Sequence, residues 1–189
     1  MIDFKEKARE GRKQVLKMIH KAGSSHIGSN FSVLDIGVVL YDYINPIGED
    51  RDRVIWSKGW VAATAYWLLA EKGIIPKEDL EKYGDLESGY IGLVERGVPG
   101  IETTTGAMGH GLCVGVGMAL AAKRGNKSYE TFVIMSDGEM DCGTSWESAL
   151  LANHHHLNNL CVIVDYNKLQ AMGKVEDILS LEPLKDKWK

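Results

Sequence analysis

The sequence predicts an α/β fold, a doubly wound and mostly parallel sheet flanked by helices, with residues 1–189 forming a single domain. Two short apolar runs, 131–135 and 160–164, are bounded by polar residues, as is typical of buried strands in a parallel sheet. The segment between them begins with Thr144-Ser145-Trp146-Glu147, a capping-box pattern that predicts the start of a helix. Strand, helix and strand in this order form the repeating unit of an α/β sheet.

Helical and strand periodicities account for most of the remaining chain. In chain order we expect a helix ending at Ala22, a buried helix over Ser32–Tyr43, a strand over Arg53–Ser57, an Ala-rich helix to about Lys72, a short helix begun at Pro76, a long loop over 83–99 and a helix from Gly111 through Ala122. The charged stretch 175–189 is only weakly periodic and ends without a helix-stop signal, so we expect the domain to be short at its C-terminal end.

Three glycines, Gly111, Gly115 and Gly117, lie within the last predicted helix. Each costs that helix about 1 kcal/mol relative to Ala. We therefore expect these glycines to permit close packing against another backbone.

The composition is ordinary for a globular domain, with 44% hydrophobic and 25% charged residues. A net charge of −4 gives no electrostatic reason to propose nucleic acid or an anionic membrane as a partner. No apolar run approaches the roughly 18 residues that a membrane helix needs, and Met1–Lys21 lacks a signal peptide's apolar centre. We expect a cytoplasmic protein whose three cysteines are reduced.

Polar residues follow both strands of the first predicted unit. Asp137-Gly138 comes directly after one strand, and Asn167 follows the other about thirty residues later. Because α/β sheets bind ligands at the carboxyl ends of their strands, both side chains should lie at the ligand-binding edge. Asp137 alone would indicate a turn cap, but a carboxylate, a carboxamide and a glycine together suit Mg²⁺ carrying a diphosphate.

The order of several such motifs resembles the N-terminal, thiamine-diphosphate-binding half of transketolase. In that family an Asp-Gly pair after one strand is closed by Asn after the next, usually with Gly where this chain has Ser136. The resemblance covers nearly the whole chain. The matching stretches are Ser25–Gly28, Asp52–Gly59, Thr104–Gly111, Ser136–Gly138 with Trp146-Glu147, and Asp165–Asn167.

The resemblance implies a role for each matching residue. Asp137, Asn167 and the backbone carbonyl of Leu169 would hold Mg²⁺. The residues implied to bind the cofactor are Gly138 against the diphosphate, the backbone of Gly106, Ala107 and Met108, and Trp60 beside the thiazolium. The residues implied to be catalytic are His26, which would reach the substrate's oxygens, and Glu147, which would join a carboxylate network between subunits.

The implied activity is transfer of a two-carbon ketol unit from a ketose-type donor to an aldehyde acceptor, with thiamine diphosphate as the electron sink. The family's activating Glu comes from a pyrimidine-binding domain that this chain lacks. The resemblance therefore implies a separate pyrimidine-domain subunit, in an α₂β₂ assembly, and a small sugar or ketone substrate. Alternatives are an acyloin-forming carboligase and a non-catalytic scaffold subunit.

Three positions depart from the family pattern. Trp60 stands where a His is usual, the stretch 89–93 lacks a second usual His, and Cys142 replaces a Glu. Trp60 could line the cofactor cleft or fill core volume, and Cys142 is better interpreted as a structural thiol than as a nucleophile. These departures favour a substrate other than the ordinary pentose phosphates.

Two further patterns are weaker. A Rossmann-type nucleotide domain would need a phosphate-binding glycine loop after the first strand, and 57–60 does not form one. His154-His155-His156 are consecutive helical positions that point about 100° apart, so they cannot share one zinc ion.

Overall fold

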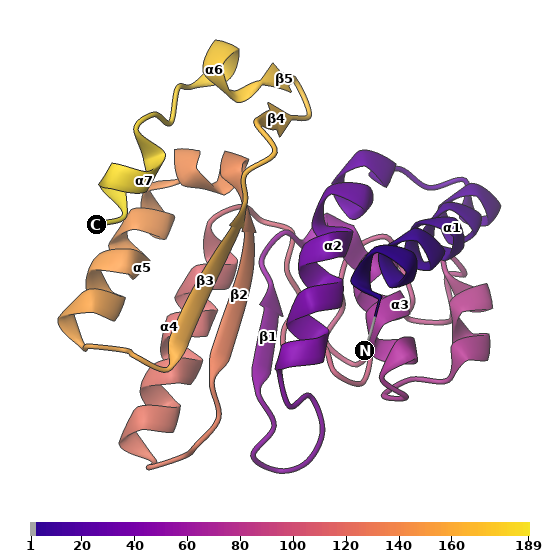
Figure 1. Ribbon diagram of the computed structural model, residues 1–189, viewed down its shortest axis with the longest axis horizontal. Coiled ribbons are helices and arrows are strands. Elements are labelled where there is room, and N and C mark those ends of the chain that lie inside the picture. Colours follow the sequence, from indigo (N-terminus) through magenta and orange to yellow (C-terminus); the bar gives the residue numbers. More distant parts are fainter. Residues whose placement is uncertain (1–2) are drawn as a thin grey trace.

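The centre of the molecule is a three-stranded parallel sheet with the strand order β1-β2-β3, in a computed structural model that describes residues 3–189. The strands are β1 (Arg53–Trp56), β2 (Thr131–Ser136) and β3 (Leu160–Asp165), and they lie side by side in Figure 1. Each predicted strand is confirmed to within one residue. All three strands run in the same direction, so their carboxyl ends meet at one edge of the sheet.

Three helices of the N-terminal half build the larger hydrophobic core on one face of the sheet. They are α1 (Phe4–Ala22), α2 (Ile27–Tyr43) and α3 (Ala62–Glu71), with the short 3₁₀ helix η1 (Gly59–Val61) before α3 and η2 (Lys77–Lys82) after it. Buried side chains of these helices pack with Trp56 of β1 and Ile134 of β2. The first helix ends as predicted, because Gly23 adopts the left-handed conformation (φ 59°) and donates to the last-turn carbonyl groups.

The other face of the sheet carries α4 (His110–Arg124) and α5 (Gly143–His154), which form a second, smaller core with β2 and β3. A Cβ atom added at Gly111 would lie 2.6 Å from Ser57 Cα, and one at Gly115 would collide with Val133. Gly111 and Gly115 therefore permit the close packing that the sequence predicts. Gly117 does not, since nothing lies within 4 Å of its missing Cβ.

Two predictions about helix α2 are wrong. The helix begins at Ile27 rather than near Ser32, after His26 turns the chain in the left-handed conformation (φ 69°). It is also not buried all round, because the side chains of Val39 and Tyr43 are 51% and 73% exposed.

The predicted capping box at Thr144 is also wrong, although the helix exists. Cys142 is the N-cap of α5 and makes no side-chain cap hydrogen bond. A capping box forms instead between Ser136 and Glu139, at the start of the 3₁₀ helix η3 (Asp137–Asp141). The same S-x-x-E spacing is thus used at the end of β2, one element earlier than we expected.

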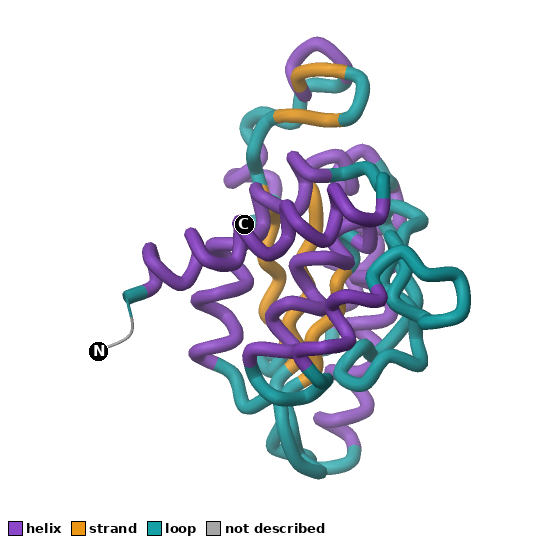
Figure 2. The backbone as a smooth tube through the Cα atoms, turned by 90° about the vertical axis from the view of Figure 1, so that its right-hand side faces the viewer, coloured by secondary structure: helices purple, strands orange, loops and turns teal. Residues whose placement is uncertain are grey.

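The C-terminal segment extends beyond the sheet as a small hairpin and two single-turn helices. The hairpin pairs β4 (Leu169–Gln170) with β5 (Gly173–Lys174), and α6 (Val175–Ile178) and α7 (Leu184–Lys187) follow. Figure 2 shows the hairpin and α6 at one end of the molecule, apart from the helices around the sheet. No helix within residues 3–189 is long and apolar enough to span a bilayer.

Candidate active site

The carboxylate of Asp137 is buried and hydrogen-bonded at the carboxyl edge of the sheet. It is 1% exposed, its Oδ1 accepts from the backbone N–H of Gly138 at 2.9 Å, and its Oδ2 accepts from the backbone N–H of Lys168 at 2.8 Å. Burial raises the pKa of Asp137, and these two hydrogen bonds partly oppose that shift. The bond from Lys168 joins the loop after β3 to the end of β2.

Asn167 lies next to the residue that donates to Asp137, so both predicted ligands are brought to one place. Its Oδ1 accepts from the backbone N–H of Leu169 at 2.8 Å, and its Nδ2 donates to Ser32 Oγ at 3.0 Å. Between Asn167 and Leu169, Lys168 adopts the left-handed conformation (φ 66°), which turns the chain sharply. Leu169 is 60% exposed at the start of β4.

The donors assembled here fit Mg²⁺. A carboxylate, a carboxamide oxygen and a main-chain carbonyl are all hard oxygen ligands, the type that Mg²⁺ prefers. A bound cation would favour the ionised carboxylate of Asp137 and so oppose the effect of burial, which raises its pKa. Over residues 3–189, no group of three or more His, Cys, Asp or Glu side chains is arranged so that it could hold a metal ion.

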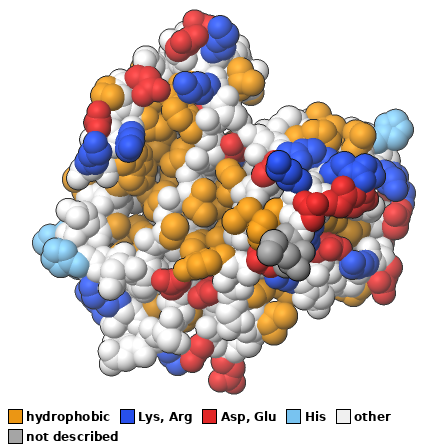
Figure 3. Space-filling model, in the orientation of Figure 1, with side chains coloured by type: hydrophobic (Ala, Val, Ile, Leu, Met, Phe, Trp, Pro, Cys, Tyr) orange, Lys and Arg blue, Asp and Glu red, His pale blue; other side chains and the backbone are white. Residues whose placement is uncertain are grey.

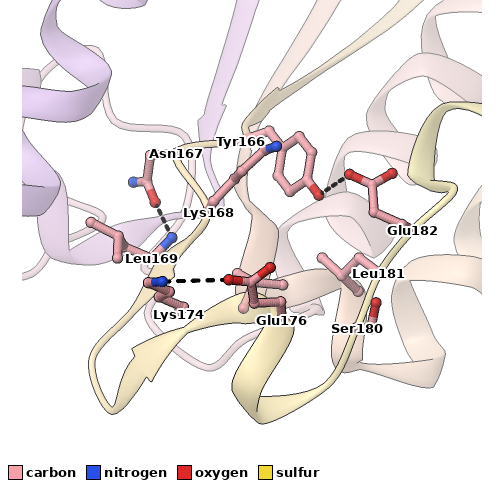
Figure 4. Close-up of a pocket in the computed structure, with 10 residues that line it drawn as sticks. Tyr166, Asn167, Lys168, Leu169, Lys174, Glu176, Ser180, Leu181 and Glu182 are labelled. Atoms are coloured by element: carbon pink, nitrogen blue, oxygen red, sulfur yellow. Dashed lines mark hydrogen bonds and ion pairs between the residues drawn. The ribbon is translucent and has the colours of Figure 1, made fainter.

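The β4–β5 hairpin lies against η3 beside these ligands. Gly138 is buried, and a Cβ atom added to it would lie 3.3 Å from Gln170 Cδ, while Gln170 Nε2 donates to Asp141 Oδ2 at 2.9 Å. Figure 4 shows the adjoining pocket of about 430 Å³, with Asn167 on one wall and the hydrogen-bonded pair of Tyr166 and Glu182 on another. The hairpin therefore forms one wall of an open cavity next to the predicted metal ligands.

Glu139 is a site residue that our sequence reasoning missed. Its side chain is fully buried and accepts from Ser57 Oγ, from the backbone N–H of Gly109 at 3.3 Å and from that of Ser136 at 2.8 Å. One carboxylate thus joins the ends of β1 and β2 to the glycine loop before α4. The S-x-x-E spacing from Ser136 was the available signal.

The predicted cofactor-facing loop, 106–108, lies beside the start of η1. Gly106 has φ 146° and Gly109 has φ 80°, conformations that favour glycine, while Ala107 and Met108 lie between them with Met108 exposed. A Cβ atom at Gly59 would lie 2.5 Å from the carbonyl oxygen of Thr105, so the two backbones are in close contact. The loop 106–108 is thereby held at the surface, where a ligand can reach it.

His26 and Trp60 are linked through the buried side chain of Asn30. Asn30 Nδ2 donates to the His26 carbonyl at 3.0 Å and to the Trp60 carbonyl at 3.3 Å, and Asn30 Oδ1 accepts from Thr64 N at 2.9 Å. His26 is exposed, and its Nδ1 lies 2.8 Å from Ser25 Oγ. Trp60 is half-buried against the larger core, so it contributes to packing and still has an exposed part.

The two interface residues singled out in the sequence lie on or beside α5. Glu147 is exposed and makes no side-chain hydrogen bond or ion pair within residues 3–189. Cys142 is half-buried next to Gly109, and burial together with the nearby carboxylates of Glu139 and Asp141 raises the pKa of its thiol. A raised pKa is the opposite of what a reactive thiolate needs, which supports a structural role for Cys142.

A parallel α/β sheet that presents oxygen ligands from adjacent strand ends beside a glycine loop defines a domain for a metal-bound diphosphate. The family model described as "Transketolase, thiamine diphosphate binding domain" matches residues 5–189. The chain belongs to this family, and the resemblance and fold class that the sequence predicts are confirmed.

Individual relatives agree with this assignment. A subunit of apulose-4-phosphate transketolase from Phocaeicola vulgatus is 40% identical over 185 residues, which cover 95% of this chain and 66% of that protein. The 6-deoxy-6-sulfo-D-fructose transketolase subunit SqwG of Clostridium sp. is 36% identical, covering 100% of this chain and 71% of that protein. A crystal structure of transketolase from Campylobacter jejuni superimposes with a TM-score of 0.91 at 30% identity, covering 100% of this chain and 32% of that chain. The chain thus spans about two thirds of the length of the two transketolase subunits.

Proposed function

We propose that this chain is the thiamine-diphosphate- and Mg²⁺-binding subunit of a split transketolase-like enzyme that transfers a two-carbon ketol unit from a ketose-type donor to an aldehyde acceptor. The observation that carries the proposal is the hydrogen bond from Lys168 N to Asp137 Oδ2, which links the two strand ends that carry the proposed oxygen ligands. The family supports the cofactor, and the relatives' names support the reaction class.

In this function the chain's own residues would bind the metal ion and bind and orient the cofactor. Asp137, Asn167 and the carbonyl of Leu169 would hold Mg²⁺, and Gly138 would allow the diphosphate to approach the backbone. The backbone of 106–108 would face the aminopyrimidine and the centre of the cofactor. The bound cofactor would supply the electron sink for breaking the C–C bond.

His26 would act on the substrate rather than on the cofactor. It is exposed, and Asn30 ties its backbone to Trp60, which would lie beside the thiazolium. An imidazole there can donate a hydrogen bond or a proton to a substrate oxygen near neutral pH.

The proposed partner is a separate pyrimidine-domain subunit, in an α₂β₂ assembly in the cytoplasm. Relatives are named as individual subunits of transketolases, which supports the existence of a second polypeptide. Glu147, on α5, would complete its carboxylate network only when that polypeptide is bound.

The proposed substrate is a modified or less hydroxylated ketose. Trp60 can donate only through its indole N–H and is larger than the usual His, so it narrows the cleft and makes it more apolar. Each sugar hydroxyl left without a partner in a buried site costs about 1–3 kcal/mol. The names of two relatives, which specify apulose 4-phosphate and 6-deoxy-6-sulfo-D-fructose, support such specialisation.

The metal site is tested by calorimetry of thiamine diphosphate and Mg²⁺ binding to the complex with the partner subunit. We expect Asp137→Ala to weaken cofactor binding by about 100-fold or more, since it removes a charged metal ligand. The exposed Asp177→Ala should bind as the wild type does. If Asp137→Ala also binds as tightly as the wild type, the site is assigned incorrectly.

Substrate choice is tested on the same complex with a panel of donors and acceptors, for the wild type and Trp60→His. We expect poor wild-type turnover of xylulose 5-phosphate with ribose 5-phosphate and an improvement in Trp60→His. Efficient wild-type turnover of these pentose phosphates would overturn the specialised-substrate proposal. Acyloin products without ketol transfer would favour the carboligase.

A scaffold subunit is the second candidate, favoured by Cys142 and Trp60 at positions where the family usually has Glu and His. The same calorimetry separates the two functions. A complex that assembles but binds no thiamine diphosphate would support the scaffold.

A further inference from the structure

The carboxamide of Asn167 can serve as a metal ligand only with its oxygen directed toward the cation. The two ends of an amide are nearly alike in shape but opposite in hydrogen bonding, because the oxygen accepts and the NH₂ group donates. The neighbouring groups must therefore determine which end faces the metal site.

The groups behind Asn167 begin with a buried ion pair. Lys58, two residues after the end of β1, donates from Nζ to Asp165 Oδ2 at 2.5 Å, and the two side chains are only 2% and 6% exposed. Neither residue was assigned a role from the sequence. The paired carboxylate of Asp165 can only accept hydrogen bonds.

Ser32 of α2 connects this ion pair to Asn167. Its hydroxyl donates to Asp165 Oδ1 at 2.8 Å, and this uses its single hydrogen. Toward Asn167 the same oxygen can therefore only accept, which it does from Nδ2 at 3.0 Å. The amide oxygen is left on the opposite side, where it accepts from Leu169 N at 2.8 Å.

We propose that Ser32 is a positioning residue that sets the orientation of the Asn167 carboxamide, so that Oδ1 faces the Mg²⁺ site before the metal binds. Lys58 acts indirectly, through its ion pair with the Asp165 carboxylate that accepts the Ser32 hydroxyl hydrogen. The proposal rests on the proposed function, since it assumes that Asn167 binds the metal. Without the Ser32 hydroxyl, the amide loses the acceptor for its NH₂ group, and only the backbone N–H of Leu169 still favours this orientation.

The first test needs neither cofactor nor metal. Hydrogen exchange of the Asn167 side-chain NH₂ is followed by NMR on the ¹⁵N-labelled full chain. We expect slow exchange in the wild type and at least tenfold faster exchange in Ser32→Ala. Ser29→Ala is the matched control, because Ser29 lies in the same helix and has no side-chain hydrogen bond among residues 3–189. Equal exchange in Ser32→Ala and Ser29→Ala would overturn the proposal.

The second test measures Mg²⁺ affinity by calorimetry on the assembled complex with thiamine diphosphate present. Removing a residue that orients a metal ligand costs about 10–100-fold in affinity, and we expect this loss in Ser32→Ala. Ser29→Ala should change the affinity by less than about threefold, and Ser32→Thr, which keeps the hydroxyl, should restore most of it. If Ser32→Ala fails to fold, Ser32→Cys, a similar side chain with a weak acceptor, replaces it in both tests.

The outcomes separate this inference from the proposed function. If the wild-type complex binds Mg²⁺ and Ser32→Ala binds it equally well, the positioning role is wrong and the metal site stands. If the wild-type complex binds neither Mg²⁺ nor thiamine diphosphate, the proposed function fails, and with it the inference.

Discussion

The two strand ends that carry the proposed metal ligands differ in how firmly the fold holds them. After β2, the residues 137–140 are all buried within η3 and are held by the fully buried carboxylate of Glu139. After β3, Lys168 and Leu169 are exposed and lead into a hairpin whose tip residue Met172 is 82% exposed. One ligand belongs to the core, whereas the other lies on a surface loop.

This difference predicts that substitutions at the two strand ends affect the stability of the fold and the binding of the metal to different extents. A change near Asp137 disturbs buried hydrogen bonds, so it should lower the free energy of unfolding as well as metal affinity. A change near Asn167 removes few buried contacts, so it should affect chiefly binding. Substitutions along the two segments can confirm or contradict this contrast.

The largest effect is expected from Glu139→Ala. It would leave the buried Ser57 hydroxyl and the backbone N–H groups of Gly109 and Ser136 without an acceptor. Because each buried donor left unpaired costs about 1–3 kcal/mol, we expect a loss of about 3 kcal/mol or more in the free energy of unfolding, measured by urea denaturation. Glu147→Ala, which removes no hydrogen bond, should change it by less than about 0.5 kcal/mol. A similarly small change in Glu139→Ala would contradict the comparison.

A second test concerns the packing of α4 against Ser57, the residue that follows β1. Gly111→Ala places a methyl group 2.6 Å from Ser57 Cα. We therefore expect a loss of about 1–3 kcal/mol in the free energy of unfolding. Gly117→Ala enters open space in the same helix and should stabilise the protein by up to about 1 kcal/mol. Thermal unfolding of both variants measures the two changes, and a Gly111→Ala variant that is as stable as Gly117→Ala would show that this close contact is absent in solution.

The third prediction addresses Asn167, on the surface loop that follows β3. Asn167→Ala should lower the free energy of unfolding by about 1 kcal/mol or less, because the side chain is only half-buried. In the assembled complex it should still weaken Mg²⁺ binding by about tenfold or more, as loss of an oxygen ligand requires. Urea denaturation and calorimetry on the same preparation test both statements. A stability loss as large as that of Glu139→Ala would mean that the two ends are equally integrated into the core.

The smallest effect is expected at the hairpin tip. Met172→Ser removes an exposed apolar side chain and should change the free energy of unfolding by less than about 0.5 kcal/mol in the free chain. Comparing its thermal unfolding with and without the partner subunit sharpens the result. A loss that appears only in the complex would show that the partner covers this tip.

The sheet and the pairing of Asp137 with Asn167 could be predicted because both follow from local patterns. Runs such as 131–135 identify buried strands, and parallel topology then brings their carboxyl ends to one edge. The start of α2 could not be placed correctly, because Ile27–Asn30 has a loop-like composition. Its first turn is stabilised by Asn30, whose side chain binds carbonyl groups from two parts of the chain.

Lys58 and Glu139 could not be assigned from the sequence, because burial of a charged residue depends on distant partners. Lys58 pairs with Asp165, 107 residues away, and Glu139 accepts from Ser57, 82 residues away. Charged residues are almost never fully buried unless they are paired, so composition alone indicates solvent exposure at both positions. The partners become visible only when the sheet brings the three strand ends together.

Figure 3 shows hydrophobic side chains gathered in the hollow at the centre of one face, and the exposed Val39, Tyr43 and Leu150 add to the apolar surface of the described chain. An uncovered surface of this kind usually marks an interaction site. It is in keeping with the proposal that the chain acts together with another polypeptide.

The hydrogen bonds of Asn30 have a mechanical consequence. A single buried carboxamide joins the carbonyl groups of His26 and Trp60 and also holds the start of α3 through Thr64 N. The two backbone segments that would border the substrate are therefore linked, and separating them to admit a bulkier molecule would break these hydrogen bonds. On this side of the cleft, substrates would be selected by size, because a substrate would have to fit an opening whose width is set before it binds.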